Sequence, residues 1–236
     1  MRKWEKKRFW QTVSVNPIRE GSGYEIYLDE KILNTPKKAP LVVPTRTMAE
    51  MVALEWRLVD KKINPQVMPY TRFVNSSIDK IKPQINDIRK LIIEYGDCDL
   101  ICYRAESPKE LFVRQELAWD SLIKWSEKEL NAPLKVYTGI IHRPQPSKSI
   151  LELEKHVFHM SIFQLCALHD LVTISGSLIL SLSVIKGFLT ENSAWEASQV
   201  DEKWQIERWG SDTQAERAND EKRTSFIRAA QFFKAC

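Results

Sequence analysis

Apolar and polar residues alternate along the first part of the chain, from Phe9 to about Val43. The apolar positions are rich in aromatic and β-branched residues, which are typical of half-buried β-strands. Residues with turn chemistry separate the runs, for example Asn16-Pro17. The pattern therefore predicts short hairpin-forming strands in the segments FWQTVSV, GYEIYL, KILNT and LVV.

After the last of these runs the spacing changes to that of an amphipathic helix. Apolar residues recur at three- and four-residue intervals from Met48 to Leu58, and Thr45 or Thr47 is placed to cap the first turn. This helix is expected to close one side of the sheet. Pro83 begins a further predicted helix, and an extended stretch, NPQVMPYTRF, is expected between the two.

The rest of the chain shows only helical spacing and no convincing strand. Ser193 followed by Glu196 predicts a capping box at the start of one helix, and Gly210 is placed to end that helix. The expected helices cover about residues 109–130, 149–167, 171–187, 193–209 and 212–234.

The longest uncharged apolar run, LVTISGSLILSLSVI, has 15 residues between Asp170 and Lys186. A membrane-spanning helix needs roughly 20 mainly apolar residues, so the run predicts a buried core helix and no membrane insertion. The sequence as a whole predicts an α+β fold. A small N-terminal mainly β domain is expected over residues 1–96, and a C-terminal all-α helical bundle domain over residues 97–236.

The net charge of +4 belongs to the first ten residues, MRKWEKKRFW, which hold five basic residues and one acid. The remainder has 30 basic and 30 acidic residues. A nucleic-acid-binding domain normally carries its positive charge over a face or groove, so this distribution argues against nucleic acid as the main partner. The alternative is an RNA- or anionic-membrane-binding protein that acts through this arm, with Trp4, Phe9 and Trp10 available for stacking.

Sequence features of catalysis are scarce. The chain has seven glycines, no G-x-S-x-G motif and no glycine-rich phosphate loop. The zinc-ligand types His156, His159, Cys166 and His169 extend over about 20 Å if they share one helix, which is too far for one metal ion. We therefore expect no enzyme, metal or cofactor. A hydrolase or transferase with His142 or His169 as its base is the remaining enzymatic alternative.

The segment WQIERWG at 204–210 combines aromatic residues with an acid and a base. On a helix, Trp204 and Glu207 project in nearly the same direction, so Glu207 is expected on an apolar face, paired with Lys203 or Arg208. One interpretation is a core helix with an internal ion pair. The other is a partner-binding patch, because Trp and Arg are enriched at interaction hot spots. Its candidate residues are Trp204, Ile206, Glu207, Arg208 and Trp209.

Several segments together resemble the ATP synthase assembly chaperones that are specific for the alpha subunit. The segments are YLDEKILNTPKKAPLVVPT, ALEW, INPQVMPYTRFVNSSID, CDLICYRAESP, RQELAWDSLIKW, ISGSLILSLSV and WQIERWGSD. The resemblance runs nearly end to end. One departure is Asp29-Glu30-Lys31, where the family usually has Asp-Gly-Arg, so the glycine-assisted turn geometry is not expected here.

The resemblance implies a two-domain chaperone without a cofactor. Such a protein binds the unassembled alpha subunit of F-type ATP synthase and shields the surface that later meets the beta subunit. It also implies a functional role for Glu207, the acid in the Q-I-E-R-W-G motif. We expect a monomer when free. The scattered cysteines fit a reducing compartment, and the basic arm directly after Met1 favours the bacterial cytoplasm over the mitochondrial matrix.

Overall fold

The computed structural model of the chain describes residues 7–18 and 21–236. Its contacts divide into two compact units. The first contains Met1–Ile85, Ile162–Cys166 and Gln231–Cys236, and the second contains Asn86–Ser161 and Ala167–Ala230. The sequence predicts a domain boundary after residue 96, and the division into domains 1–96 and 97–236 remains a prediction.

The first unit holds a small sheet, as the alternating pattern predicts. Strands β1 (Val13–Pro17) and β2 (Tyr24–Leu28) are antiparallel, and β2 also pairs with β3 (Lys31–Ile32) and β4 (Val42–Val43). Ile26 and Leu28 are buried on the inner face of β2. The α+β class is therefore confirmed, with the mainly β part at the N-terminus and helices after it.

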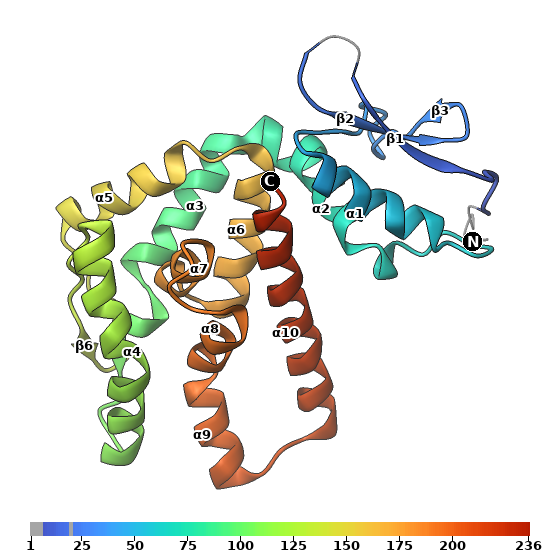
Figure 1. Cartoon of the computed structure of the whole chain (residues 1–236). Helices are drawn as coiled ribbons and strands as arrows, with labels where there is room; N and C mark the ends of the chain where they lie inside the picture. The colour runs from blue at the N-terminus through green and yellow to red at the C-terminus, as the bar shows by residue number, and fades with distance from the viewer. Residues whose placement is uncertain (1–6, 19–20) are drawn as a thin grey trace. The chain divides into compact units, whose positions relative to one another are not determined.

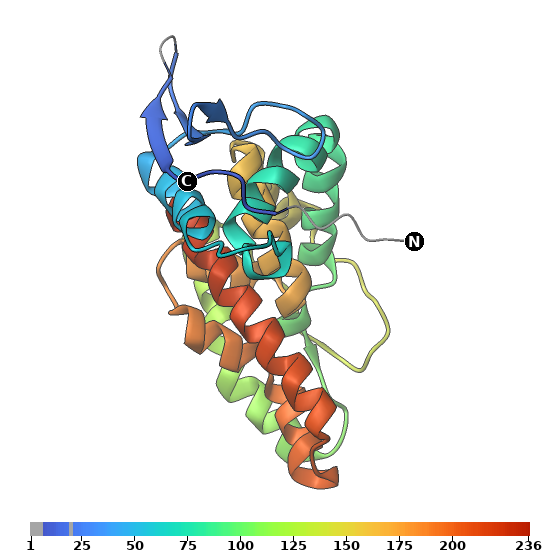
Figure 2. The same ribbon diagram turned by 90° about the vertical axis from the view of Figure 1, so that its right-hand side faces the viewer.

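Helix α1 (Arg46–Arg57) covers this sheet (Figures 1 and 2). The predicted cap is confirmed, because Thr45 Oγ1 accepts a hydrogen bond from the backbone N–H of Met48. Trp56 packs 5.1 Å from the buried Trp10 ring and donates its Nε1 hydrogen to Thr71 Oγ1. These contacts link Trp10 and Thr71, which follows α1 in the chain, to Trp56 of α1.

The stretch after α1 is helical rather than extended. Helix α2 (Pro69–Ser76) is followed by a π-helical segment (Ser77–Ile81) and a 3₁₀ turn (Lys82–Gln84), and α3 (Ile85–Asp97) comes next. The expected extended conformation of NPQVMPYTRF is wrong, because Pro65–Val67 is a 3₁₀ helix and α2 begins at Pro69. The Glu55 carboxylate accepts from the N–H groups of Tyr70 and Thr71 and so caps α2 from a neighbouring helix. That cap comes from a distant position and is invisible in the local pattern.

The second unit is mainly helical, and two of its helices each bury a row of large apolar residues. Trp119, Leu122 and Trp125 are buried along α4 (Lys109–Leu130), which has the predicted bounds. Helix α7 (Leu178–Ile185) is buried over seven of its eight residues. The other helices of the second half are α5 (Ser147–Phe158), α6 (Ile162–Ser175), α8 (Glu191–Ser198), α9 (Val200–Trp209) and α10 (Thr213–Lys234).

Three predicted helices are interrupted. The 171–187 run breaks where Gly176 takes a left-handed φ of 70°, after which Ser177 caps α7. The 193–209 run breaks between α8 and α9, where the Ser198 hydroxyl bonds back to the Trp195 carbonyl. The 149–167 run is divided between α5 and α6, with His159 as the C-cap of α5.

Two further expectations for this part of the chain are wrong. Thr190, not Ser193, caps α8, because its hydroxyl accepts from the Ser193 N–H. Two very short strands also occur where none was expected, since β5 (Tyr103–Arg104) pairs in parallel with β6 (Tyr137–Thr138). Two residues are too few to show an alternating pattern. The predicted C-terminal residue Gly210 does end α9, with φ of 82° and its N–H bonded to the Ile206 carbonyl.

Asp29 stabilises the turn between β2 and β3, where a glycine-assisted turn was not expected. It adopts a left-handed φ of 55°, and its carboxylate accepts from the backbone N–H groups of Gln11 and Thr12. These hydrogen bonds hold the pKa of Asp29 below its usual value. The turn therefore forms without a glycine because a charged side chain stabilises it.

Asp29→Ala is expected to lower the melting temperature at pH 7, because the variant keeps an unfavourable backbone conformation and loses these hydrogen bonds. The folded-state pKa is depressed, so this contribution is present above the unfolded-state pKa and is lost as the pH falls through the folded value. Melting curves of both proteins at pH 7 and pH 3 test this. A difference as large at pH 3 as at pH 7 would assign the effect to backbone strain alone.

Candidate functional site

Helix α9 carries all five candidate partner-binding residues and is mostly exposed. Trp204 is its single buried residue among those described, with 7% of its surface accessible. Ile206 is partly exposed and Trp209 is 78% exposed at the end of the helix. The core interpretation therefore applies to Trp204 alone, and the remaining candidates face outward.

Trp204 is contacted by two guanidinium groups. Arg114 of α4 lies 4.8 Å from the centre of the Trp204 ring, and Arg208 lies 4.6 Å from it. A guanidinium over an indole face is attracted by the negative potential of the π system. The ring therefore joins the end of α9 to α4 and holds Arg208 against the surface.

Glu207 is paired with Arg114 in two-point geometry. The Arg114 Nη1 and Nη2 atoms lie 2.8 Å and 2.7 Å from the two Glu207 carboxylate oxygens. The ion pair lowers the pKa of Glu207 and raises that of Arg114. Pairing with Lys203 or Arg208 was expected and is wrong, since Lys203 bonds to Glu196 instead. The Glu207 side chain is also 53% exposed rather than buried on an apolar face.

Two further hydrogen bonds attach the α8–α9 region to α4. Gln115 Nε2 donates to Asp201 Oδ1 at 2.7 Å, and Trp119 Nε1 donates to the Ala197 carbonyl at 2.8 Å. Gln115 and Trp119 are both buried. The position of α9 beside α4 (Figure 1) therefore does not depend on the Glu207 ion pair.

The α4 side of this surface was not predicted from the sequence. Val113 is exposed and Leu117 is 80% exposed, and both flank Arg114 on the same helix. The apolar spacing of α4 gave a signal, since Val113 and Leu117 are four residues apart and lie outside the row of Trp119, Leu122 and Trp125. We define the α4–α9 patch as Val113, Arg114, Leu117, Trp204, Ile206, Glu207, Arg208 and Trp209.

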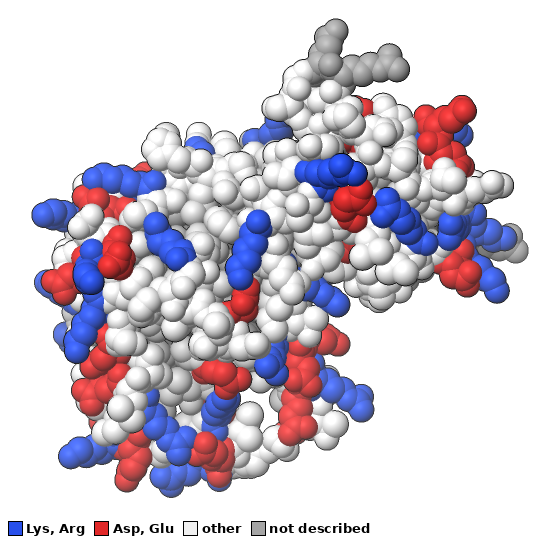
Figure 3. All heavy atoms as spheres, viewed as in Figure 1, with Lys and Arg blue, Asp and Glu red and all other residues white. Residues whose placement is uncertain are grey.

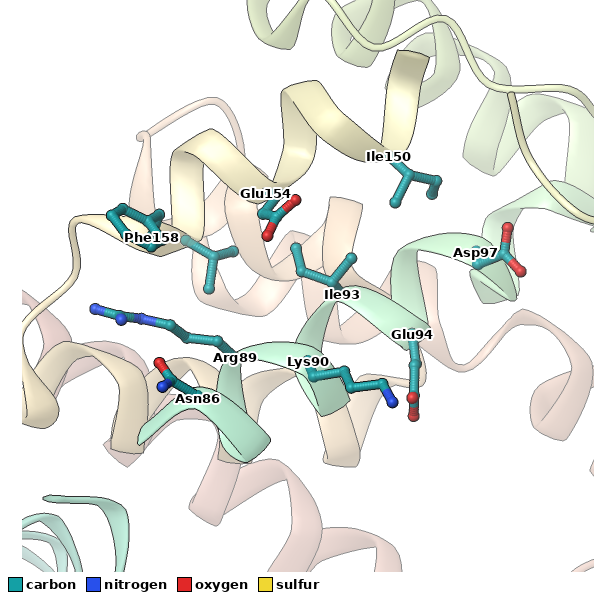
Figure 4. Close-up of a pocket in the computed structure, with 10 residues that line it drawn as sticks. Asn86, Arg89, Lys90, Ile93, Glu94, Asp97, Ile150, Glu154 and Phe158 are labelled. Carbon is teal, nitrogen blue, oxygen red and sulfur yellow. The ribbon is translucent and has the colours of Figure 1, made fainter. Parts of the chain in front are cut away.

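A separate hollow of about 460 Å³ lies between α3 and α5 in the second unit (Figure 4). Ile93 and Ile150 line its centre, and the Arg89 guanidinium lies 4.8 Å from the centre of the Phe158 ring at one end. No Ser, Thr, Cys or His side chain is among the residues lining it. The hollow therefore offers an apolar centre with side chains of both charges at its rim.

The histidines and cysteines do not gather into a metal-binding group. In residues 7–18 and 21–236, no three His, Cys, Asp or Glu side chains are placed to hold a metal ion. His142 Nε2 lies 3.0 Å from Asp97 Oδ2, and His169 Nδ1 lies 3.3 Å from Asp170 Oδ1, which are local ion-pair contacts. The side-chain contact of each candidate base is with a carboxylate.

The described part of the basic arm is engaged within the first unit. The Arg8 guanidinium donates to the carbonyls of Val59 and Trp10, and Trp10 is buried. Trp10 is therefore not available to stack on bases, whereas Phe9 is 64% exposed and Trp4 lies outside the described residues. On the face seen in Figure 3, both signs of charge are interspersed. Among the described residues, no helix has the length and apolar character that crossing a membrane requires.

Known proteins match the chain over nearly all of its length. The family described as ATP12 chaperone protein matches residues 7–127. Protein atp12, mitochondrial, from Schizosaccharomyces pombe is 25% identical over 242 residues, which cover 98% of this chain and 82% of that protein.

Two solved bacterial structures agree with the fold. The crystal structure of Atp12 from Paracoccus denitrificans has a TM-score of 0.93 and 40% identity, and the match covers 97% of each chain. The Atu1473 protein from Agrobacterium tumefaciens, described as a putative chaperone, has a TM-score of 0.92 and 35% identity over 98% of this chain and 86% of that one. The family match and the solved relatives define the class as a chaperone of ATP synthase assembly. The chain belongs to the ATP12 chaperone family.

Proposed function

We propose that the chain binds the free alpha subunit of F-type ATP synthase and shields its subunit interface until the catalytic sector assembles. Membership of the ATP12 chaperone family supports the assembly role. The observation that carries the binding part is the end of α9, where Trp209 and Ile206 are exposed on the same helix end as the Glu207–Arg114 ion pair. Exposed apolar side chains beside ordered charges are typical of a partner-binding surface.

The proposed action needs no catalysis, nucleotide or metal ion. Binding to an exposed apolar surface of the client lowers the free concentration of the aggregation-prone subunit by mass action. Charges within the patch set the register and reject wrong partners. Release occurs when the beta subunit competes for the same face of the alpha subunit.

We further propose that the free chain is a monomer that works in the bacterial cytoplasm. The two solved bacterial relatives are 40% and 35% identical to it, compared with 25% for the mitochondrial protein of S. pombe, which supports a bacterial source.

Co-expression of the chain with the alpha subunit tests the proposal. The soluble yield of the alpha subunit is expected to rise several-fold, and a complex of the two chains is expected to elute from size-exclusion chromatography. An alpha subunit that stays insoluble in the presence of abundant, folded chaperone would contradict the proposed function.

Trp209→Ser is expected to weaken alpha-subunit binding about tenfold or more while leaving the melting temperature nearly unchanged. The side chain is 78% exposed, so it adds little to the core, and aromatic anchors dominate many interfaces. Phe158→Ser, which removes an exposed aromatic side chain from α5, is the matched control. Equal affinities of both variants and the unaltered chain would remove Trp209 from the binding surface.

A further inference from the structure

Three cationic side chains at the end of α9 and on the adjacent α4 differ in their partners. Arg114 is held by both oxygens of Glu207, and Lys203 is paired with Glu196. Arg208 has no ion pair or hydrogen bond from its guanidinium to any residue that the structure describes. The α4–α9 patch therefore presents one guanidinium whose hydrogen-bonding edge is unused.

Contact with Trp204 fixes this guanidinium in place. Arg208 lies 4.6 Å from the ring centre, and Trp204 is itself almost fully buried. A guanidinium held against an aromatic ring by cation–π attraction keeps its N–H groups free to donate two hydrogen bonds to a carboxylate. Since the group is already ordered, less side-chain entropy is lost when a partner binds.

Glu207 differs from Arg208 in that its charged group is already paired within the patch. Both of its carboxylate oxygens accept from Arg114, and Arg114 lies over the same Trp204 ring as Arg208. Without this carboxylate, two uncompensated cations would lie beside one indole. Glu207 thus neutralises Arg114 and keeps it on Trp204.

We propose that Glu207 is a positioning residue that acts through Arg114, and that Arg208 is the residue that binds a carboxylate of the client. The inference rests on the proposed function. The client segment that fits carries an acidic residue next to apolar side chains, which cover Trp209 beside Arg208 on α9 and Leu117 one turn after Arg114 on α4. This assigns the α4 residues to the binding surface as well.

A double-mutant cycle separates positioning from direct contact. Affinities for the purified alpha subunit are measured for the unaltered chain, Glu207→Gln, Arg114→Gln and the double variant. If Glu207 acts through Arg114, Glu207→Gln weakens binding about tenfold in the unaltered chain and causes no further loss in the Arg114→Gln background. An equal loss in both backgrounds would show that Glu207 contacts the client directly and would overturn the assignment.

Arg208→Gln tests the carboxylate-binding role. Binding is expected to weaken about tenfold and to become less sensitive to salt, because one charge pair with the client is lost. Arg208→Lys keeps the charge but not the planar fork, so it is expected to recover only part of the affinity. Unchanged affinity and unchanged salt dependence in Arg208→Gln would overturn this assignment.

An NMR measurement on the free chain tests the positioning role of Glu207 without the client. With 5-fluorotryptophan incorporated, the ¹⁹F resonance of Trp204 is expected to shift in Arg114→Gln and in Glu207→Gln, and not to shift further in the double variant. Additive shifts would contradict positioning through Arg114. Thermal melting checks that each variant folds. If a Gln variant does not fold, Glu207→Asp and Arg114→Lys provide a second double-mutant cycle.

The outcomes distinguish this inference from the proposed function. If the unaltered chain does not bind the alpha subunit, the proposed function fails and the client role of Arg208 fails with it. If the unaltered chain binds and the cycle is additive, the proposed function stands and the positioning role of Glu207 is wrong.

Discussion

Glu207→Lys is expected to abolish protection of the alpha subunit, with affinity reduced on the order of a hundredfold. The new lysine would face Arg114, and Arg208 is close by over the Trp204 ring. Three cations in one patch repel one another and would drive Arg114 away from Trp204. Light scattering of the isolated alpha subunit during warming, with and without the variant, measures the protection.

The same variant is expected to remain folded. The Glu207 and Arg114 side chains are both about half exposed, and exposed ion pairs contribute little to stability. The buried hydrogen bonds from Gln115 and Trp119 continue to hold the α8–α9 region to α4. Glu216→Lys, an equal charge change at an exposed position of α10, is the control. Full protection by Glu207→Lys, or a lost melting transition, would contradict a role in binding.

Asp99→Ala is expected to lower the free energy of unfolding by about 3 kcal/mol. The Asp99 carboxylate is fully buried and accepts from the backbone N–H groups of Ile101 and Ile179. Ile179 lies in the first turn of α7, the most completely buried helix of the second unit. Alanine would leave these N–H groups buried without an acceptor. Urea denaturation followed by circular dichroism measures the change.

The pH dependence of stability provides a second readout for Asp99. Burial raises the pKa of Asp99 to about 6 in the folded state, compared with about 3.9 in an unfolded chain. The folded state therefore binds more protons between these values, so its stability falls as the pH rises through this window. Relative to Asp99→Asn, which does not titrate, the free energy of unfolding is expected to fall by about 3 kcal/mol between pH 3.5 and pH 7. A constant or rising difference would contradict this.

The elements that could be predicted from the sequence are those set by local residues. The strand alternation up to Val43, the Thr45 cap of α1, the bounds of α4 and the end of α9 at Gly210 all follow from residues within a few positions of each feature. Short-range spacing and capping hydrogen bonds determine these features, so the sequence pattern is sufficient.

The helix breaks could not be predicted because single residues decide them against a favourable apolar pattern. Gly176 interrupts a run that is apolar on both sides, and Ser198 competes for a backbone carbonyl within an otherwise helical segment. The cap of α2 is supplied by Glu55 of the neighbouring helix α1. In each case the spacing of apolar residues does not reveal the backbone conformation or hydrogen bond that ends or begins the helix.

The candidate site was predicted in part. The sequence indicated the residues of α9 but not the partner of Glu207, because Arg114 lies 93 positions away along the chain. Helical geometry relates only neighbours on one helix, so it suggested Lys203 and Arg208 instead. Tertiary packing of α4 against α9 decides the pairing. The role of the five α9 residues in partner binding remains a prediction.

Competition by the beta subunit tests the central claim most directly. A purified complex of this chain with the alpha subunit is mixed with the beta subunit and separated by size-exclusion chromatography with light-scattering detection. We predict that the alpha subunit elutes with the beta subunit and that this chain elutes alone, because both partners use the same face of the alpha subunit. A stable assembly containing all three chains would contradict the claim that this protein shields that interface.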